Sequence, residues 1–183
     1  MSDTAIKPES LNVGCGSDIK ANWINLDRSQ LPGVNVVHDL DVFPWPFPQS
    51  SMGNIRIINV MEHLSDATKV LEELHRLAAP ECTITIRVPC VNGPDAFSDP
   101  THKIFFNQHS FDFFDPSTRH GKERSYYSTA KFHIKKRIYY SRIIPGLPYL
   151  KVRNAFLRFL MSGASILLGG VIWSVEVEMV PLK

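Results

Sequence analysis

The feature that most constrains the fold of this chain is a glycine turn between two short apolar stretches near its N-terminus. The first stretch and the turn read LNVGCG (residues 11–16), and the second, WINLD (residues 23–27), ends in an acid. The pattern predicts a strand, a ligand-contacting loop and a second strand, because ligands in open α/β sheets bind beyond the carboxyl ends of the strands. Gly14 and Gly16 permit a positive φ and a close approach of ligand to backbone. Asp27 can accept hydrogen bonds from two vicinal ribose hydroxyls; the alternative is a plain tight turn.

The spacing after this turn separates several kinds of nucleotide site. A dinucleotide-binding fingerprint needs a third glycine three residues after the second, and an acid about 20 residues further on. Ile19 occupies the third glycine position and Asp27 follows too soon, so a nicotinamide cofactor is disfavoured. No P-loop sequence follows the turn either. A nucleoside without a pyrophosphate fits better, and S-adenosylmethionine (SAM) is the common one.

Five motifs taken together resemble those of class I SAM-dependent methyltransferases, in their compact type-11-like branch. In chain order they are LNVGCG, WINLD, HDLDVFPWPF, INVMEHL and DPTHKIFF. The resemblance covers residues 9 to about 115. It implies a Rossmann-like fold with an antiparallel last strand, methyltransferase activity and SAM as the cofactor.

Apolar stretches alternate along the chain with loops and one helical pattern. Strands are predicted at 10–13, 23–26, 34–38, 55–59, 83–88, 132–139 and 173–180. A helix capped by Ser65 and ended by Pro80 is predicted between the fourth and fifth strands. The alternation predicts an α/β fold with a doubly wound, mostly parallel sheet. At 183 residues the chain has the length of a single domain.

The resemblance also implies which residues contact the cofactor. Asn12, Gly14, Cys15 and Gly16 form the first cofactor-binding segment, in which the two glycines let the backbone pass the methionine portion. Asp27 is expected at the ribose, Asp39 with Leu40 at the adenine, and the backbone carbonyl of Asn59 at the cofactor ammonium. Asn12 departs from the family pattern, because the first strand usually carries an acid there. Asp39 and Asn59 also have simpler interpretations, as a turn acid and a loop-start residue.

Candidate catalytic residues lie after the fifth predicted strand, in the sequence DPTHK (residues 99–103). His102 is the candidate general base, because imidazole titrates near neutral pH. Asp99 would orient it, and Lys103 would hold an anionic group of the substrate. The alternative is that Asp99 and His102 only pin the loop by hydrogen bonds. For Glu62 and His63, just beyond the fourth strand, a structural role in orienting the loop is preferred.

Composition and cysteines are those of an ordinary globular chain. Hydrophobic residues make up 44% and charged residues 21% of the sequence, which is typical of soluble proteins. Cys15, Cys82 and Cys90 are scattered, and an odd count argues against a disulfide framework. No secretory signal is evident at the N-terminus, so a cytoplasmic location is expected. No His/Cys cluster has the spacing of a zinc site, so no metal is expected.

Charge is distributed unevenly along the sequence. Residues 1–118 carry a net charge of −7 and residues 119–183 a net charge of +9, with no acid between Glu123 and Glu176. Residues 155–173 are largely apolar but are interrupted by Arg158 and glycines. Residues 140–172 are therefore interpreted as a basic, apolar insertion or lid before the last strand. Peripheral contact of residues 131–170 with a membrane is expected in preference to a nucleic-acid partner.

The sequence therefore predicts a SAM-dependent methyltransferase. The acceptor is not identified, although a hydroxyl of a saccharide or small metabolite is preferred, and a glycan or lipid-linked substrate would suit the basic, apolar C-terminal third. The alternatives are a non-catalytic SAM-fold scaffold or binding module, and an RNA-directed methyltransferase. The sequence leaves the oligomeric state open.

Overall fold

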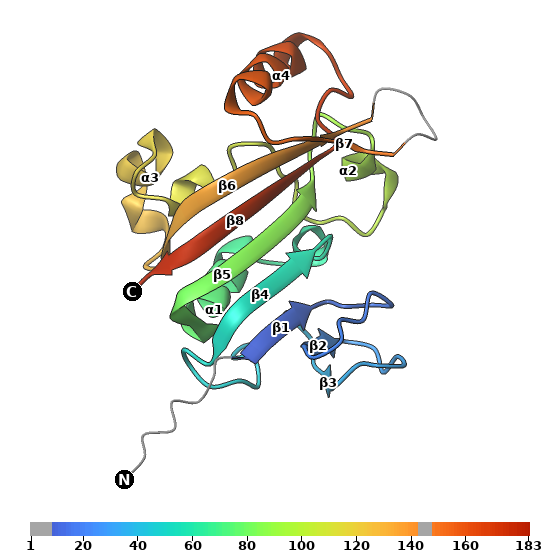
Figure 1. The fold of residues 1–183 in the computed structure, drawn as a ribbon, viewed down its shortest axis with the longest axis vertical. Helices are drawn as coiled ribbons and strands as arrows, with labels where there is room; N and C mark the ends of the chain where they lie inside the picture. Colours follow the sequence, from blue (N-terminus) through green and yellow to red (C-terminus); the bar gives the residue numbers. More distant parts are fainter. Residues whose placement is uncertain (1–8, 143–147) are drawn as a thin grey trace.

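A single twisted sheet organises the molecule (Figure 1). The computed structural model describes residues 9–142 and 148–183. Within them the strand order is β3-β2-β1-β4-β5-β8-β6-β7. The strands are β1 (Glu9–Val13), β2 (Ile24–Asp27), β3 (Val36–Val37), β4 (Met52–Ile58), β5 (Ala78–Pro89), β6 (Lys131–Ser141), β7 (Leu150–Val152) and β8 (Ser174–Leu182).

The direction of the strands agrees with the predicted α/β fold class. Strands β3, β2, β1, β4 and β5 pair in parallel. Strand β8 is antiparallel to both of its neighbours, β5 and β6. The mostly parallel sheet with an antiparallel last strand is thus confirmed. A short edge strand, β7, pairs with β6, so part of the predicted insertion at residues 140–172 belongs to the sheet.

Helical segments connect these strands. They are η1 (Met61–His63), α1 (Ala67–Leu77), α2 (Asp95–Ser98), η2 (Asp112–Phe114), α3 (Arg119–Glu123), η3 (Ser125–Tyr127) and α4 (Ala155–Leu167). Helix α1 lies against one face of the sheet (Figure 1), and its buried positions recur with helical period: Val70, Leu71, Leu74 and Leu77. In the part of the chain described, no helix is both long and apolar enough to cross a bilayer.

The start and end of α1 differ from the prediction. Asp66, not Ser65, caps the helix, and its side chain accepts hydrogen bonds from the backbone N–H of Thr68 and Lys69. The Ser65 hydroxyl and N–H instead donate to the carboxylate of Asp41. The helix ends before Pro80, because the chain enters β5 directly and carries that proline at an early position of the strand.

The proline- and aromatic-rich segment 43–48 is a loop that is fastened to α1. Its Trp45 is 1% exposed. The backbone N–H of Trp45 donates to Glu73, and its indole N–H donates to the carbonyl of Leu40. Arg76 donates to backbone carbonyls of the same loop. These bonds hold the loop after β3 in place. They also position the acidic stretch that precedes this loop.

A polar network replaces a helix in the short connection between β1 and β2. Residues 14–23 contain turns and no helix. Asn12 is buried in β1; its amide donates to the carbonyl of Asp18 and to Asn25, and accepts from Arg56. Arg56 also pairs with the Asp18 carboxylate at 2.7 Å. The loop is therefore tied to three strands by side chains on one face of the sheet.

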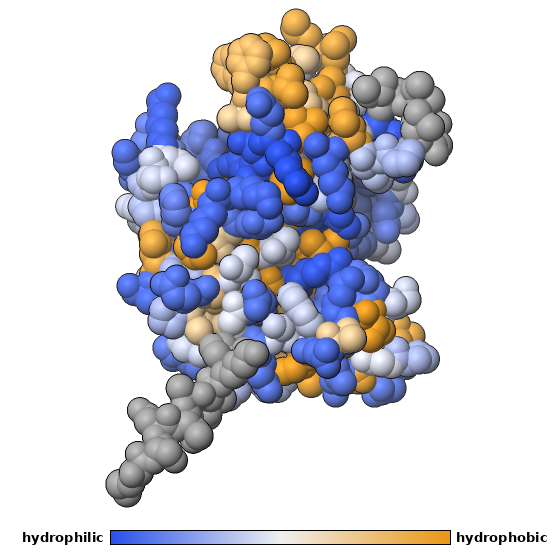
Figure 2. Space-filling view, viewed as in Figure 1, coloured by the Kyte–Doolittle hydropathy of each residue, from blue (hydrophilic) through white to orange (hydrophobic). Residues whose placement is uncertain are grey.

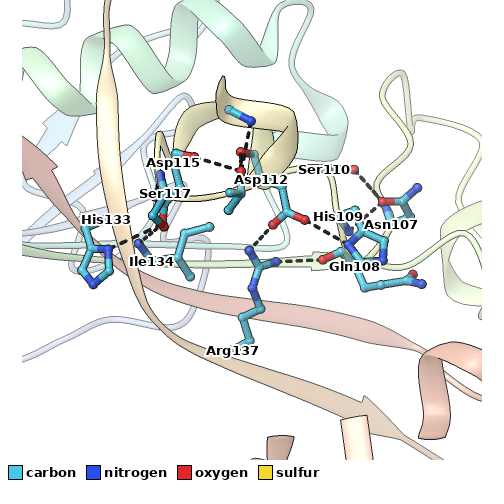
Figure 3. A network of polar contacts seen from close by, with 12 residues as sticks. Asn107, Gln108, His109, Ser110, Asp112, Asp115, Ser117, His133, Ile134 and Arg137 are labelled. Atoms are coloured by element: carbon cyan, nitrogen blue, oxygen red, sulfur yellow. Dashed lines mark hydrogen bonds and ion pairs between the residues drawn. The ribbon is translucent and has the colours of Figure 1, made fainter. Parts of the chain in front are cut away.

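A second polar network fastens the segment after β5 to β6 (Figure 3). Arg137 donates to the Asp112 carboxylate and to the carbonyl of Gln108. Asp115, which is 2% exposed, accepts from the backbone N–H of Ile134 and of Ser117. The network attaches residues 107–117 to the sheet.

Candidate functional site

Two cavities lie beyond the carboxyl ends of the parallel strands. The first, here called the Gly14 cavity, has a volume of about 580 Å³. Its wall is formed by Gly14, Asp27, Arg28, Asp39, Leu40, Asp41, Asn59, Val60, His63, Leu64, Thr101 and Lys103. Of the residues predicted to bind a cofactor, Gly14, Asp27, Asp39, Leu40 and Asn59 thus line one cavity. They come from the ends of β1, β2, β3 and β4, which are distant in sequence and adjacent in the sheet.

Gly14 presents bare backbone to this cavity. Its φ is +61°, in the left-handed region that side chains disfavour. A Cβ at this position would lie 2.4 Å from a methyl carbon of Val60. Both the conformation and the close contact therefore require glycine, and a ligand can approach the backbone here without meeting a side chain.

Asp27 is held in a fixed orientation at the end of β2. One carboxylate oxygen accepts from the N–H of Gly16 at 2.8 Å, and the other accepts from the N–H of Ser29 at 2.9 Å. Each oxygen retains a lone pair. The carboxylate can therefore still accept two hydrogen bonds from a vicinal diol.

The acids that follow β3 form the far wall of the Gly14 cavity. Asp39 accepts from the backbone N–H of Asp41 at 3.0 Å. Burial by itself would raise the pKa of Asp41, but hydrogen bonds from Ser65 and Lys103 lower it below its ordinary value. Leu40 is 5% exposed and adds an apolar surface beside these carboxylates.

Three residues predicted to bind the cofactor are absent from the wall of this cavity. The Asn12 amide is used within the β1–β2 network described above. The Cys15 side chain is buried, and burial together with the charge of Asp27 raises the pKa of its thiol. Gly16 donates its N–H to Asp27, and an added Cβ there would meet no atom within 4 Å. These residues build the loop around the cavity.

Lys103 also has a different place from the one predicted. It lines the Gly14 cavity, where its ammonium lies 3.4 Å from Asp41 and 3.2 Å from the Ser65 hydroxyl. It is absent from the wall of the second cavity. In the described structure the ammonium forms an ion pair that joins two loops, and its role in holding a substrate anion stays a prediction.

The second cavity, here called the His102 cavity, has a volume of about 700 Å³. Its wall is formed by Asn59, Glu62, His63, Arg87, Pro89, Asp95, Ser98, Asp99, Pro100, His102, Tyr140, Tyr149 and Ser174. Asn59 and His63 line both cavities. The two spaces are therefore neighbours with a shared wall, and a ligand in one would face a ligand in the other.

Glu62 is the most unusual group in the His102 cavity. It is 1% exposed, and neither carboxylate oxygen has a hydrogen-bond partner in the described structure. Burial raises the pKa of this carboxyl to about 7, against smaller lowering effects that include the nearby His102. Its backbone carbonyl accepts from Lys103 and Ile104, so Glu62 also fixes the loop that carries His102.

The hydrogen bonds of the two histidines define which ring nitrogen faces the cavity. Nδ1 of His102 lies 2.9 Å from the carbonyl of Ala96, and since a carbonyl only accepts, this nitrogen carries the proton. Nδ1 of His63 lies 2.9 Å from the Thr101 hydroxyl, which itself donates to Asp99. In both neutral rings Nε2 then keeps its lone pair. The ring centroids are 4.8 Å apart.

Asp99 does not orient His102 as predicted. Its carboxylate accepts from the hydroxyl and the N–H of Thr101, and these bonds lower its pKa. Through Thr101 it orients His63 instead. His102 is oriented by the carbonyl of Ala96, and both histidines are held in place by the loop that follows β5.

Glu62, His63 and His102 are also the one group of potential metal ligands found in the described residues. Their ligand atoms lie within 4.8 Å of one another. Ligand atoms placed about 2.0–2.2 Å from one ion are at most roughly 4.4 Å apart. The three side chains are therefore close to the spacing that a single ion would require.

Sequence reasoning missed the cation and the two tyrosines of the His102 cavity. The Arg87 guanidinium lies 5.2 Å from the centre of the Tyr140 ring. The Tyr140 hydroxyl donates to Glu176, and the Tyr149 hydroxyl donates to Asp95. Arg87 had a detectable signal, because it is the one charged residue in the apolar strand 83–88. The tyrosines had none, since the pairing of β6 with β8 brings Tyr140 to this edge and the pairing of β7 with β6 brings Tyr149 there.

Comparison with known proteins relates the fold to solved structures. No protein-family model and no curated protein matches the sequence. A SAM-dependent methyltransferase from Archaeoglobus fulgidus superposes with a TM-score of 0.57 at 16% identity, over 94% of this chain and 86% of the other. One from Thermotoga maritima superposes with a TM-score of 0.58 at 13% identity, over 95% and 82%. One from Mesorhizobium loti superposes with a TM-score of 0.53 at 12% identity, over 96% of this chain and 92% of the other.

These similarities extend over nearly the whole chain. They show that it has the Rossmann-like fold found in SAM-dependent methyltransferases, including the region beyond residue 115 where the sequence motifs end.

Proposed function

We propose that this chain is a class I SAM-dependent methyltransferase that binds the cofactor in the Gly14 cavity and a methyl acceptor in the His102 cavity. The observation that carries the proposal is the pair of neighbouring cavities with a shared wall at Asn59 and His63. Methyl transfer needs two ligands held end to end in this way, with water kept out. The shared fold supports the same assignment.

The residues of the Gly14 cavity suit SAM. Asp27 would accept from the ribose hydroxyls with the lone pairs left by its backbone bonds. Asp39 would accept from the exocyclic amine of adenine beside the apolar Leu40, and the carbonyl of Asn59 would accept from the ammonium. Bare backbone at Gly14 leaves room for the methionine portion. When bound, SAM supplies an activated methyl group, and the protein has to orient the acceptor.

His102 is the proposed general base. Its Nε2 keeps a lone pair because Nδ1 donates to the Ala96 carbonyl, and it lines the acceptor side of the shared wall. A proton leaving the acceptor would pass to Nε2. The nearby charge of the buried Glu62 carboxylate would then favour the imidazolium through space, without a hydrogen bond between the two side chains.

A polar acceptor that bears hydroxyls suits the wall of the His102 cavity. Tyr140, Tyr149, Asp95 and Ser98 offer oxygen atoms that can accept hydrogen bonds from hydroxyls of the acceptor, and Arg87 offers a cation. A saccharide or small metabolite with one anionic group matches this set. An RNA substrate is disfavoured because the cavity wall mixes acids with its one arginine.

Binding of SAM and of its demethylated product by calorimetry tests the proposal. We expect both ligands to bind the native chain. The Asp27→Asn substitution should weaken the binding of SAM at least tenfold, because the charge-assisted hydrogen bonds to the ribose are lost. Glu81→Gln, which removes an exposed acid elsewhere, serves as the matched control and should bind normally. His102→Asn should also bind SAM normally, because this histidine lines the other cavity.

The same experiment distinguishes the enzyme from a scaffold. A native chain that binds neither ligand at millimolar concentration contradicts the proposal and leaves a non-catalytic module. An Asp27→Asn variant that binds as tightly as the native chain places the cofactor elsewhere.

A further inference from the structure

Helix α4 leaves an apolar surface exposed at one end of the molecule. None of its residues is buried. Seven large apolar side chains in α4 or directly after it have exposed fractions from 49% to 87%, whereas Met161 packs against the core. We call this surface the apolar cap, which consists of Phe156, Leu157, Phe159, Leu160, Ile166, Leu167 and Leu168. Figure 2 shows it as a continuous hydrophobic region over α4, bordered by hydrophilic side chains.

Such a surface requires a physical explanation. Helices that are apolar around most of their circumference are normally buried, and contiguous exposed apolar patches mark sites of interaction with a partner or a membrane. Helix α4 carries one charged residue, Arg158, among 13. Removal of the apolar cap from contact with water is therefore energetically favourable.

The cap has a positively charged border without acids. Lys151 and Arg153, just before α4, are exposed and form no ion pair in the described part of the chain. Arg158 donates to the backbone carbonyls of Arg137 and Arg153 rather than to a carboxylate. The sequence contains no Asp or Glu from 124 to 175. An occupant of this surface must accept both apolar side chains and uncompensated positive charge.

The cap is attached firmly to the sheet. Asn92, in the loop after β5, donates to the carbonyls of Ser165 and Leu168 and accepts from the N–H of Val171 and Ile172. These four bonds fix the C-terminal end of α4. The helix is thereby presented as a rigid surface and not as a loose segment.

We propose that the apolar cap docks on the surface of an anionic lipid bilayer, with α4 lying in the interface and the basic residues beside the headgroups. Apolar side chains enter the acyl boundary, while each nearby cation gains roughly 1 kcal/mol from an anionic membrane surface. This inference goes beyond the methyltransferase proposal and does not depend on it, because no residue of the cap lines either cavity.

The dimensions and charge of α4 favour this occupant over others. Thirteen residues give a helix about 20 Å long, whereas a bilayer core is about 30 Å thick, so α4 lies on a membrane rather than crossing it. A second copy of the chain is disfavoured, because a two-fold interface brings the same surface patch of both copies together. The sequence from 124 to 175 contains no acid, so this part of the partner copy would offer Lys151 and Arg153 no carboxylate.

Docking would also bring the His102 cavity near the membrane. Tyr149 and Ser174 line that cavity, and they are the residues on either side of the segment that contains β7 and α4. An acceptor carried on a lipid would thus reach the cavity from the surface on which the cap rests.

Flotation with vesicles tests the proposal on the full chain. We expect binding to vesicles of phosphatidylcholine with 30–40 mol% phosphatidylglycerol (roughly the range where surface charge dominates) and at least tenfold weaker binding to phosphatidylcholine alone. Phe159→Ser should weaken binding at least tenfold. Tyr126→Ser is the matched control, because both aromatic side chains are 74% exposed and Tyr126 lies in η3.

Charge and oligomeric state complete the test. Lys151→Glu with Arg153→Glu should reduce binding to anionic vesicles and leave the circular dichroism spectrum unchanged. Equal binding of the Phe159→Ser and native chains, or no vesicle binding by the native chain, overturns the proposal. Light scattering that shows a dimer abolished by Phe159→Ser, without vesicle binding, assigns the cap to a second copy instead.

Discussion

Glu62 shows how a single residue can depend on burial for its chemistry. Glu62 stands beside a histidine after a strand, and this sequence context favoured a structural role. The backbone carbonyl of Glu62 has such a role, since it accepts hydrogen bonds from the loop that carries His102. Its side chain differs, because both oxygens lie buried without partners and its pKa rises to about 7. A group with this pKa can change charge when a neighbouring histidine accepts a proton. The same residue thus shapes the loop through its backbone and the electrostatics through its side chain.

The pKa of Glu62 makes stability depend on pH. Because the folded pKa lies above the ordinary glutamate value of 4.5, protonation favours the folded state, and this contribution is present below pH 4.5 and lost as pH rises through 7. The free energy of unfolding should change by roughly 3 kcal/mol in total over this pH range. We expect Glu62→Gln to be more stable than the native chain at pH 8, with the two converging near pH 4.5. Urea unfolding at both pH values measures this, and a constant difference across the range contradicts it.

At the scale of elements, the ends of helices and loops were set by specific side chains. The helical period of α1 was readable from sequence because Val70, Leu71, Leu74 and Leu77 recur on one face. Its cap was not, because serine and aspartate are both good caps and stand next to each other. The choice depends on Asp41, a residue 24 positions away that takes the Ser65 hydroxyl.

Exchange of the cap residue tests this assignment. Asp66→Ala should lower the free energy of unfolding by about 1 kcal/mol, because the N–H groups of Thr68 and Lys69 lose their acceptor. Asp66→Asn keeps an acceptor and should remain within a few tenths of the native value. Denaturant unfolding of the two variants decides the matter. Equal destabilisation by both would mean that the charge and not the cap bond matters.

At the scale of the whole molecule, polar networks join segments that no periodicity connects. Asp115 links the segment after β5 to β6 through bonds to Ser117 and Ile134. Burial by itself would raise the pKa of Asp115, but these hydrogen bonds lower it. The same junction carries the Arg137–Asp112 pair (Figure 3). The sheet is thus held together on its C-terminal side by charge-assisted bonds as well as by apolar packing.

Removal of Asp115 should have a large effect on stability. Asp115→Ala leaves two backbone N–H groups without their acceptor, one of them in β6, and should cost about 2–3 kcal/mol. Glu123→Ala is the control, because that acid lies in an exposed ion pair with Arg119. Its removal should have a negligible effect on the free energy of unfolding. Thermal unfolding compares the two. If Asp115→Ala and the control have the same melting temperature, the hydrogen bonds of Asp115 do not stabilise the fold.

The sequence by itself determined the features that depend on neighbours along the chain. The glycine turn at 14–16, the acid at 27 and the apolar periods predicted the sheet and the cavity at the ends of its first strands, because positive φ and alternating burial are local properties. The tertiary structure alone decided which side chains share a cavity. Arg87, Tyr140 and Tyr149 meet His102 only through the pairing of β5, β8 and β6. Lys103 lies beside Asp41, which is 62 residues away in the sequence, and it is absent from the wall of the His102 cavity. Contacts between distant segments depend on the folded sheet, and no period in the sequence encodes them.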